Sequence, residues 1–231
     1  MFKNIILIPY RNRKSHLKYF LEHTVPIIQE FMPNTKVIVI EQCEGKLFNR
    51  GKILNVGFKE YSDKTKYFIT NDVDINPTKL CIETYYNRYV DKEHVLGIYT
   101  SFHDTLGGVI KIRSTIFNKI NGFPNNFWGW GVEDKAFQNR CEYFNIKKIT
   151  SLTDNIDHPM FFKIFDDIKD KFIDKKHYED RRVENKKKNF KKKTDKDKKK
   201  LIMSSGLNTL DYKIVKRKEL HKIVELIKVD I

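Results

Sequence analysis

Short apolar runs alternate with longer amphipathic segments along the first half of the chain. The short runs are typical of strands and lie at Asn4–Ile8, Lys36–Ile40, Tyr67–Thr70, Val95–Thr100 and Val109–Ile112. Helical apolar spacing is found between several of them, at Lys14–Phe31, Lys52–Tyr61 and Pro77–Tyr89. Strands separated by helices favour an α/β fold, with a single doubly wound, mostly parallel sheet flanked by helices.

Two prolines bear on the predicted helices. Pro26 lies inside the first one, and because proline lacks an N–H and clashes with the preceding turn, we expect the helix to kink or end there. Pro77 instead stands near the first turn of its helix, where proline is tolerated.

The pattern changes after Thr150. Asp157–Arg182 is charged with scattered aromatic side chains, and a lysine-rich run follows at Asn185–Lys200. Like charges repel one another, so we expect this run to be solvated and partly disordered. Ordered structure is expected again at Leu201–Asp211, followed by two possible strands at Tyr212–Lys216 and Ile223–Val229.

Three phenylalanines precede the lysine run at a spacing that is compatible with a helix: Phe161, Phe162 and Phe165. Such a row is most often the packing face of a helix on a sheet, and the alternative is a cap over a ligand site.

Composition adds limits rather than a function. A chain of 231 residues that is 40% hydrophobic suits one large globular domain. The net charge of +15 lies largely in the lysine run, which holds one aromatic residue, Phe190, so base stacking is disfavoured and no nucleic-acid partner is expected. The three cysteines share no metal-binding spacing and are expected to be reduced.

The N-terminal apolar run, Ile5–Ile8, is too short for a signal peptide or a membrane anchor. We therefore expect a cytoplasmic protein, in the host cytoplasm if the source is viral.

Candidate chemistry is sought where predicted strands end, because ligands of doubly wound sheets bind beyond the carboxyl ends of the strands. Asp72 and Asp74 follow the third strand in the sequence NDVD, and alternation places both carboxylates on one side. Oxygen ligands in this arrangement suit Mn²⁺ or Mg²⁺ bound to a diphosphate. Two acids at a turn are also common without any metal.

A second candidate is Phe127–Asp134, with the sequence FWGWGVED. It holds both tryptophans of the chain, Trp128 and Trp130, whose faces could stack on a sugar, while a nearby acid could accept a hydroxyl proton. A tight turn before a helix that starts near Glu133 explains the same pattern without a ligand.

Taken in order, the motifs resemble those of the β-1,4-galactosyltransferase family. They are Pro9–Arg13 (PYRNR), Phe48–Phe58 (FNRGKILNVGF), Asp72–Asp74 (DVD), Asn121–Asp134 (NGFPNNFWGWGVED), Ser205–Leu210 (SGLNTL) and the final Val229–Ile231. The resemblance covers nearly the whole chain and departs from the family mainly between His158 and Ser204.

The resemblance implies an inverting glycosyltransferase of the GT-A fold that moves galactose, or N-acetylgalactosamine, from a UDP-sugar to a sugar hydroxyl. It implies one catalytic domain over residues 1–231. Residues 1–158 would form the nucleotide-sugar and catalytic core, residues 159–204 a lid with the lysine-rich insertion, and residues 205–231 the strands that complete the domain.

The resemblance also assigns residues to the donor and the metal. Donor contacts would come from Pro9, Tyr10, Arg11, Arg13, Phe48, Arg50, Asp72, Val73, Gly108 and Trp130. The metal, Mn²⁺ with Mg²⁺ as a possible substitute, would be held by Asp74, His158 and Asn155. The family usually has methionine where Asn155 stands, and the harder amide oxygen would tolerate Mg²⁺ better.

Asp134 matches the family's catalytic base, which removes the acceptor proton as the hydroxyl attacks the anomeric carbon, and Glu133 would help to orient the substrates. Two departures bear on specificity. Lys135 replaces the usual acid after the base, so the usual N-acetylglucosamine acceptor is in question. Thr105 replaces a bulky aromatic beside the C2 substituent of the donor, so UDP-GalNAc could enter as well as UDP-Gal.

A different class of function remains open. A catalytically inactive relative could bind glycans or polyanions through its basic insertion.

Overall fold

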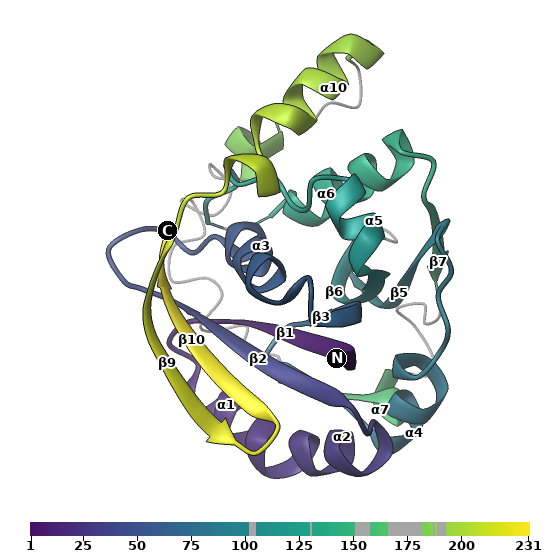
Figure 1. Cartoon of the computed structure of the whole chain (residues 1–231), viewed down its shortest axis with the longest axis vertical. Coiled ribbons are helices and arrows are strands. Elements are labelled where there is room, and N and C mark those ends of the chain that lie inside the picture. The colour runs from purple at the N-terminus through teal and green to yellow at the C-terminus, as the bar shows by residue number, and fades with distance from the viewer. Residues whose placement is uncertain (102–104, 130, 151–157, 166–181, 187, 189–192) are drawn as a thin grey trace.

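One eight-stranded sheet forms the centre of the computed structural model, in the strand order β7-β5-β6-β3-β1-β2-β10-β9 (Figure 1). The structure describes residues 1–101, 105–129, 131–150, 158–165, 182–186, 188 and 193–231. The strands of the sheet are β1 Phe2–Tyr10, β2 Thr35–Gln42, β3 Thr65–Asn71, β5 His94–Ser101, β6 Thr105–Arg113, β7 Lys147–Thr150, β9 Lys213–His221 and β10 Val224–Asp230.

The sheet is mixed but mostly parallel. Strand β1 pairs in parallel with β2 and β3, β10 pairs in parallel with β2, and β7 pairs in parallel with β5. Strands β6 and β9 run antiparallel to their neighbours. The predicted α/β architecture is therefore confirmed.

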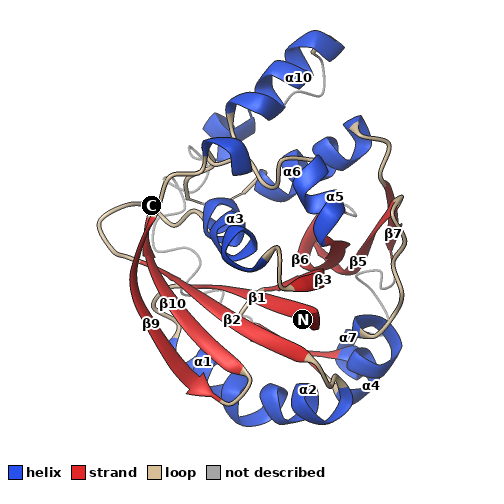
Figure 2. Cartoon of the chain, in the orientation of Figure 1, coloured by secondary structure: helices blue, strands red, loops and turns tan. Residues whose placement is uncertain are grey.

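Helices cover both faces of the sheet (Figure 2). Along β1, Ile5 and Leu7 pack in one apolar cluster, whereas Ile6 and Ile8 pack in another. The first cluster lies under α3 (Arg50–Tyr61), α5 (Ser114–Lys119) and α6 (Glu133–Tyr143). The second lies under α1 (Lys14–Tyr19), α2 (Val25–Phe31) and α4 (Lys79–Cys81). Continuous apolar strands are what a sheet buried on both faces requires.

The helical segment that contains Pro26 is irregular, as expected. A π-helical turn, Phe20–Thr24, joins α1 to α2, and Pro26 stands at the start of α2. Proline supplies no N–H to the carbonyl four residues earlier, and the wider turn takes up the mismatch. A second π-helical turn, Ile82–Tyr86, continues α4.

The helix proposed for the three phenylalanines is wrong. Helix α7 covers only His158–Phe161, and the chain then extends as β8, Phe162–Ile164, antiparallel to β4, Ile75–Pro77. Phe162 is buried in the second cluster. The spacing of these phenylalanines fits either a helix or a strand. Pairing with β4 stabilises the strand.

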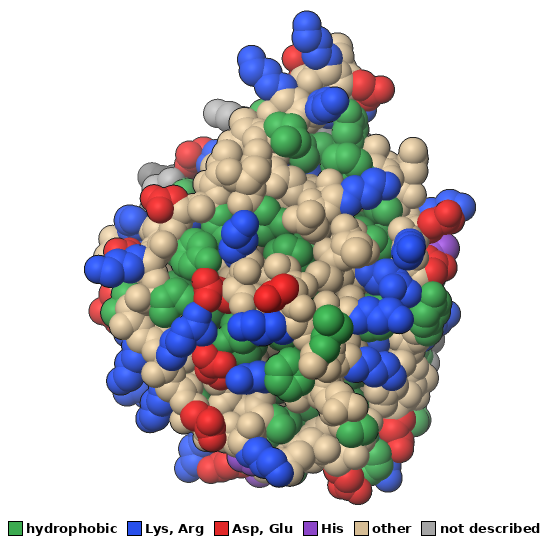
Figure 3. All heavy atoms as spheres, in the orientation of Figure 1, with side chains coloured by type: hydrophobic (Ala, Val, Ile, Leu, Met, Phe, Trp, Pro, Cys, Tyr) green, Lys and Arg blue, Asp and Glu red, His purple; other side chains and the backbone are tan. Residues whose placement is uncertain are grey.

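The lysine run is not disordered throughout. Residues 182–186 are helical, and α10 covers Asp195–Ser204. Thr194 caps α10 by accepting a hydrogen bond from the Asp197 N–H, while Ile202 buries its side chain. A cap and an apolar anchor hold a helix whose other residues are mostly exposed. Lysine side chains therefore cluster at the end of α10 that extends from the body (Figure 3). A short 3₁₀ turn, Leu207–Thr209, connects α10 to β9.

Candidate active site

The carboxyl ends of β1, β2 and β3 lie at one edge of the sheet. Pro9 and Tyr10 at the end of β1 pair with Ile40 and Glu41 of β2, and Tyr10 is buried. Parallel pairing thus brings the segments that follow the three strands together, as the sheet-edge argument expects.

Arg11 and Phe48 connect the first two of these segments. The Arg11 guanidinium lies 5.3 Å from the centre of the Phe48 ring, and its Nη1 donates to the Lys46 carbonyl at 2.7 Å. Arg13 lies nearby in sequence, with Nη1 buried and without a hydrogen-bond partner among the described residues.

Two asparagines that the sequence analysis did not single out join α3 to the loop before α6. Asn49 caps α3 by accepting from the Lys52 N–H at 2.9 Å, and its Nδ2 donates to the Asn125 carbonyl at 2.8 Å. Asn55 Nδ2 donates to the Phe123 carbonyl at 2.7 Å, while its Oδ1 accepts from the Phe123 N–H. Their place within the FNRGKILN motif was the available signal.

The loop after β3 is held by backbone and side-chain bonds. The Asp72 N–H donates to the Gly108 carbonyl at 3.2 Å, and Asn71 Nδ2 donates to the carbonyls of Asp72 and Ile75. Gly108 has φ +63°, and a Cβ there would lie 2.4 Å from the Tyr99 ring, so only glycine fits. Val73 is buried, which leaves its backbone as the part that could meet a ligand.

Arg50 joins the two acidic motifs. Its Nε donates to Asp72 Oδ1 at 2.7 Å and its Nη1 donates to Asp134 Oδ1 at 2.8 Å. The guanidinium fork therefore holds the first acid of DVD and the expected base side by side. Arg50 Nη2 is buried and has no hydrogen-bond partner within the described part of the chain.

Burial dominates the electrostatics of this triad. It raises the pKa of Asp72 to about 6, with Asp74 adding to the rise and Arg50 opposing it. Burial also raises the pKa of Asp134 well above the ordinary carboxyl range, against the effect of Arg50. These carboxylates lack full compensation by the described protein groups, as expected where a cation completes a site.

Asp134 owes its position to an unusual loop. We name residues 121–132 the tryptophan loop. In it Gly129, Gly131 and Val132 have φ of +77°, +97° and +76°. Positive φ is costly for β-branched valine, and Val132 immediately precedes α6, whose first residues are Glu133 and Asp134. The strained backbone at Val132 thus orients Glu133 and Asp134 towards the site.

The predicted metal ligands are only partly described. Asp74 follows Asp72 by two residues, and its carbonyl accepts from the Phe165 N–H at 2.9 Å. The pairing of β8 with β4 therefore brings the chain that follows His158 against the chain that follows Asp74. The side chain of His158, and all of Asn155 and Trp130, lie outside the described residues. No group of three metal-binding side chains is found among the described ones.

Family models match most of the chain. The N-terminal region of glycosyl transferase group 7 matches residues 1–87, and a second model, described as the N-terminal domain of galactosyltransferase, matches residues 88–163. Human β-1,4-galactosyltransferase 4 is 39% identical over 153 residues, which is 62% of this chain and 43% of that protein. Bovine β-1,4-galactosyltransferase 1 is 38% identical over 149 residues, which is 61% of this chain and 37% of that protein. The matches thus span about two fifths of these relatives.

Solved structures share the fold. A mutant Drosophila β-1,4-galactosyltransferase 7, in complex with manganese, UDP-Gal and xylobiose, superposes with a TM-score of 0.76 at 22% identity, over 100% of this chain and 94% of that chain. A Pyrobaculum calidifontis mannosyltransferase, in complex with GDP-Man and Mn²⁺, has a TM-score of 0.52 at 11% identity, over 64% and 54% of the two chains.

The expectation of a cytoplasmic protein is wrong. The matched relatives are β-1,4-galactosyltransferases, and the matched region is about two fifths of their length, so the first residues of this chain do not decide its compartment. Within the described part of this chain, no helix has the length and apolar character to cross a membrane. The prediction used the first residues of the chain alone, whereas relatives of more than twice the matched length carry further sequence.

Proposed function

This chain belongs to the β-1,4-galactosyltransferase family, glycosyltransferase group 7, and from that premise we propose that it transfers galactose from UDP-galactose to a sugar hydroxyl. The observation that carries the proposal is the fork of Arg50, which joins Asp72 of the DVD motif to Asp134 at the start of α6. An inactive polyanion-binding relative has no need for this partly buried arrangement.

The donor would bind at the sheet edge. Arg11 and Arg13 follow β1, and Phe48 and Arg50 lie at the N-terminal end of α3, where helix N–H groups also favour anions. The unpartnered Nη2 of Arg50 and Nη1 of Arg13 are buried donors that diphosphate oxygens would satisfy.

The donor set at this edge fits Mn²⁺. Asp74 would be a direct ligand, with Asp72 beside it, and His158 and Asn155 would complete the set from the chain before β8. When bound, the ion would neutralise charge on the UDP leaving group. Burial and the nearby Asp74 carboxylate raise the pKa of Asp72, which suits a site that a divalent cation would complete.

Asp134 would act as the general base. It would accept the proton of the acceptor hydroxyl while that oxygen attacks the anomeric carbon and the bond to UDP breaks, with inversion. Arg50 would hold the carboxylate in place, and Glu133 would orient the acceptor.

Specificity would be set at two positions. Thr105 begins β6 and is only partly buried, so a donor with a larger C2 substituent, UDP-GalNAc, could be accepted beside UDP-Gal. Lys135, next to the base, would select a different acceptor from that chosen by an acid at this place. The xylobiose bound by the Drosophila relative makes xylosides worth including in an acceptor panel.

The test is UDP release from UDP-Gal, UDP-GalNAc, UDP-Glc and UDP-GlcNAc, with Mn²⁺ or EDTA, and with or without N-acetylglucosamine, glucose and xylobiose. We expect metal-dependent turnover of a galacto-configured donor that is lost in Asp74→Ala. If UDP and Mn²⁺ fail to bind at all, the proposal is wrong, and polyanion binding by the basic insertion becomes the better account.

A further inference from the structure

The tryptophan loop is contacted by the start of the lysine-rich stretch. Residues 182–186 are helical, and four of them, Arg182, Val183, Glu184 and Lys186, are exposed. Asn185 is the exception, with 1% of its surface accessible. A helical turn that buries only an amide is unusual, because apolar residues normally form the buried face.

The buried amide binds the tryptophan loop directly. Asn185 Nδ2 donates to the carbonyl of Gly131 at 3.1 Å and to that of Trp128 at 3.4 Å. These carbonyls are three residues apart, so one donor group spans the turn that contains both positive-φ glycines. Without Asn185 the turn would lose the bonds that fix its width next to Val132 and Asp134.

Two residues near Asn185 in the sequence also contact the tryptophan loop. A side-chain carbon of Arg182 lies 3.8 Å from the place that a Cβ on Gly131 would occupy. Lys188 Nζ donates to the Asn126 carbonyl at 2.9 Å. Arg182 and Asn185 are three positions apart in the helical turn, which places them on one side of it, and Lys188 follows this turn in the sequence.

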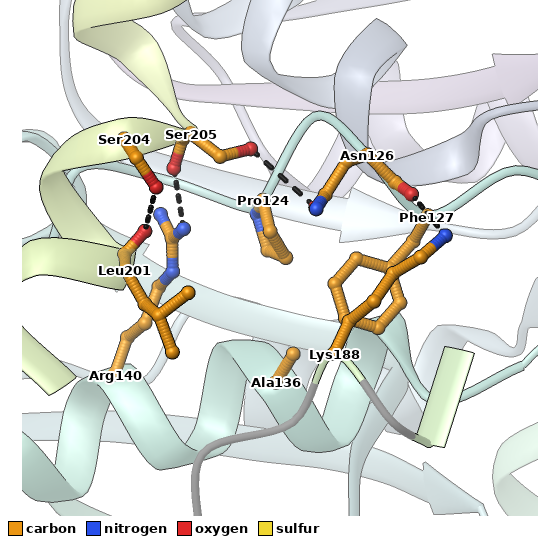
Figure 4. Close-up of a pocket in the computed structure, with 9 residues that line it drawn as sticks. All are labelled: Pro124, Asn126, Phe127, Ala136, Arg140, Lys188, Leu201, Ser204 and Ser205. Atoms are coloured by element: carbon orange, nitrogen blue, oxygen red, sulfur yellow. Dashed lines mark hydrogen bonds between the residues drawn. The ribbon is translucent and has the colours of Figure 1, made fainter. Parts of the chain in front are cut away.

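Residues that follow the lysine run contact the base of the same loop. Ser205 Oγ accepts from the Asn125 N–H at 2.8 Å, and Asn121 Nδ2 donates to the Ile202 carbonyl at 2.7 Å. Figure 4 shows Lys188 and Ser205 approaching Asn126 from two sides. The pocket between them has a volume of about 30 Å³, which is too small for a sugar. The hydrogen bonds from Lys188 and Ser205 to Asn126 show that the two surfaces are in contact there.

We propose that Asn185 is a positioning residue, and that the basic insertion acts through it to hold the tryptophan loop, and with it Asp134, in the reactive arrangement. This deepens the proposed function and rests on it for its effect on turnover. The physical contact itself is open to measurement without any substrate.

The chain offers a specific probe, because its two tryptophans, Trp128 and Trp130, both lie in this loop. Quenching of tryptophan fluorescence by acrylamide therefore reports on the loop alone. We expect Asn185→Ala and the isosteric Asn185→Asp, which lacks the donor, to raise the quenching constant at least twofold. Asn185→Gln, which retains the amide, should restore part of the protection. Lys186→Ala, one residue away and exposed, is the matched control and should match the wild type.

Turnover gives the second readout. We expect kcat to fall roughly tenfold in Asn185→Ala, because small displacements of a catalytic group are costly, while KM for UDP-Gal changes less than twofold and the melting temperature stays close to that of the wild type. If Asn185→Ala does not fold, Lys188→Met serves instead, with a smaller rise in quenching expected.

Unchanged quenching and kcat in Asn185→Ala, or in Lys188→Met where that variant is used, would overturn the inference. If quenching rises but the wild type transfers no sugar, the contact stands and the proposed function fails. Equal effects of Asn185→Ala and Lys186→Ala would also count against a specific role of the amide.

Discussion

The tryptophan loop has two sides, and they are held in different ways. Towards the sheet its Phe123 is buried in the first apolar cluster and stacks on Phe137 of α6, while Asn49 and Asn55 add hydrogen bonds. Towards the lysine-rich stretch it is held mainly by polar atoms, of which the Asn185 amide is central.

The difference has an energetic meaning. Burying one large apolar side chain contributes about 1.5–3 kcal/mol, whereas a net hydrogen bond contributes about 0.5–1.5 kcal/mol. The sheet side is therefore fixed by the fold, and the insertion side is attached by weaker, replaceable bonds. Changes on the sheet side should abolish chemistry, and changes on the insertion side should adjust it.

The largest effect is expected at Asp134. Asp134→Asn keeps the shape of the side chain but cannot accept a proton, so kcat should fall by roughly 10²–10⁴-fold. Steady-state UDP release in the presence of acceptor measures this. Asp195→Asn, an exposed acid on α10, is the control and should retain wild-type turnover.

The same carboxylate gives a pH dependence. A base works when it is deprotonated, so activity is present above its pKa and is lost as the pH falls through it. Because burial raises the pKa of Asp134, the acid limb of kcat/KM should lie above the range of an ordinary aspartate. A limb near pH 4, measured in constant ionic strength buffers, would contradict this assignment.

The next effect is expected at Arg50. Arg50→Met removes the fork between Asp72 and Asp134, together with the buried Nη2 proposed for the diphosphate. We expect kcat/KM for UDP-Gal to fall by about 10²–10³-fold, as for other losses of a buried charge-stabilising donor. Calorimetric titration with UDP and Mn²⁺ should show weaker binding. Arg88→Met, on the surface, should bind UDP normally.

How far the sequence predicts this arrangement differs between the two sides. Apolar runs in the sequence predict β1, β2 and β3. The rule that ligands bind beyond the carboxyl ends of parallel strands then directs attention to the DVD motif after β3. The Arg50–Asp134 pair was not found, since these residues are 84 positions apart and only the packed fold brings them together. The roles of the predicted donor residues stay predictions.

On the insertion side the sequence predicted much less. The burial of Asn185 cannot be predicted from the sequence, because its neighbours are charged and show no apolar periodicity that would mark a buried face. The short strand β8 was missed for another reason: its partner β4 comes from a distant part of the chain. Helix α10 was missed because its lysines hide a single buried residue, Ile202.

An intermediate effect is expected beneath the proposed metal site. The Tyr86 hydroxyl donates to Asn71 Oδ1, and Asn71 in turn holds the carbonyls of Asp72 and Ile75. Tyr86→Phe should loosen the loop that presents Asp74 and weaken Mn²⁺ binding by about tenfold, in the range of outer-shell changes at metal sites. Mn²⁺ titration followed by electron paramagnetic resonance measures this.

The control for that change is Tyr89→Phe, which removes an exposed hydroxyl near Arg113 and should leave Mn²⁺ affinity unaltered. Equal affinities for Tyr86→Phe and wild type would show that Asn71 holds the loop unaided.

The smallest effect is expected on the outer surface of α10. Lys199 and Lys200 are exposed, so replacing both with glutamine removes charge without removing a buried contact. Surface changes of this kind usually alter the free energy of unfolding by less than about 0.5 kcal/mol each. We expect kcat with a neutral acceptor to stay within about twofold of wild type. A loss of turnover as large as that of Asn185→Ala would mean that the insertion acts through its charge. Turnover that survives here but falls in Asn185→Ala would assign its influence to the few side chains that face inward.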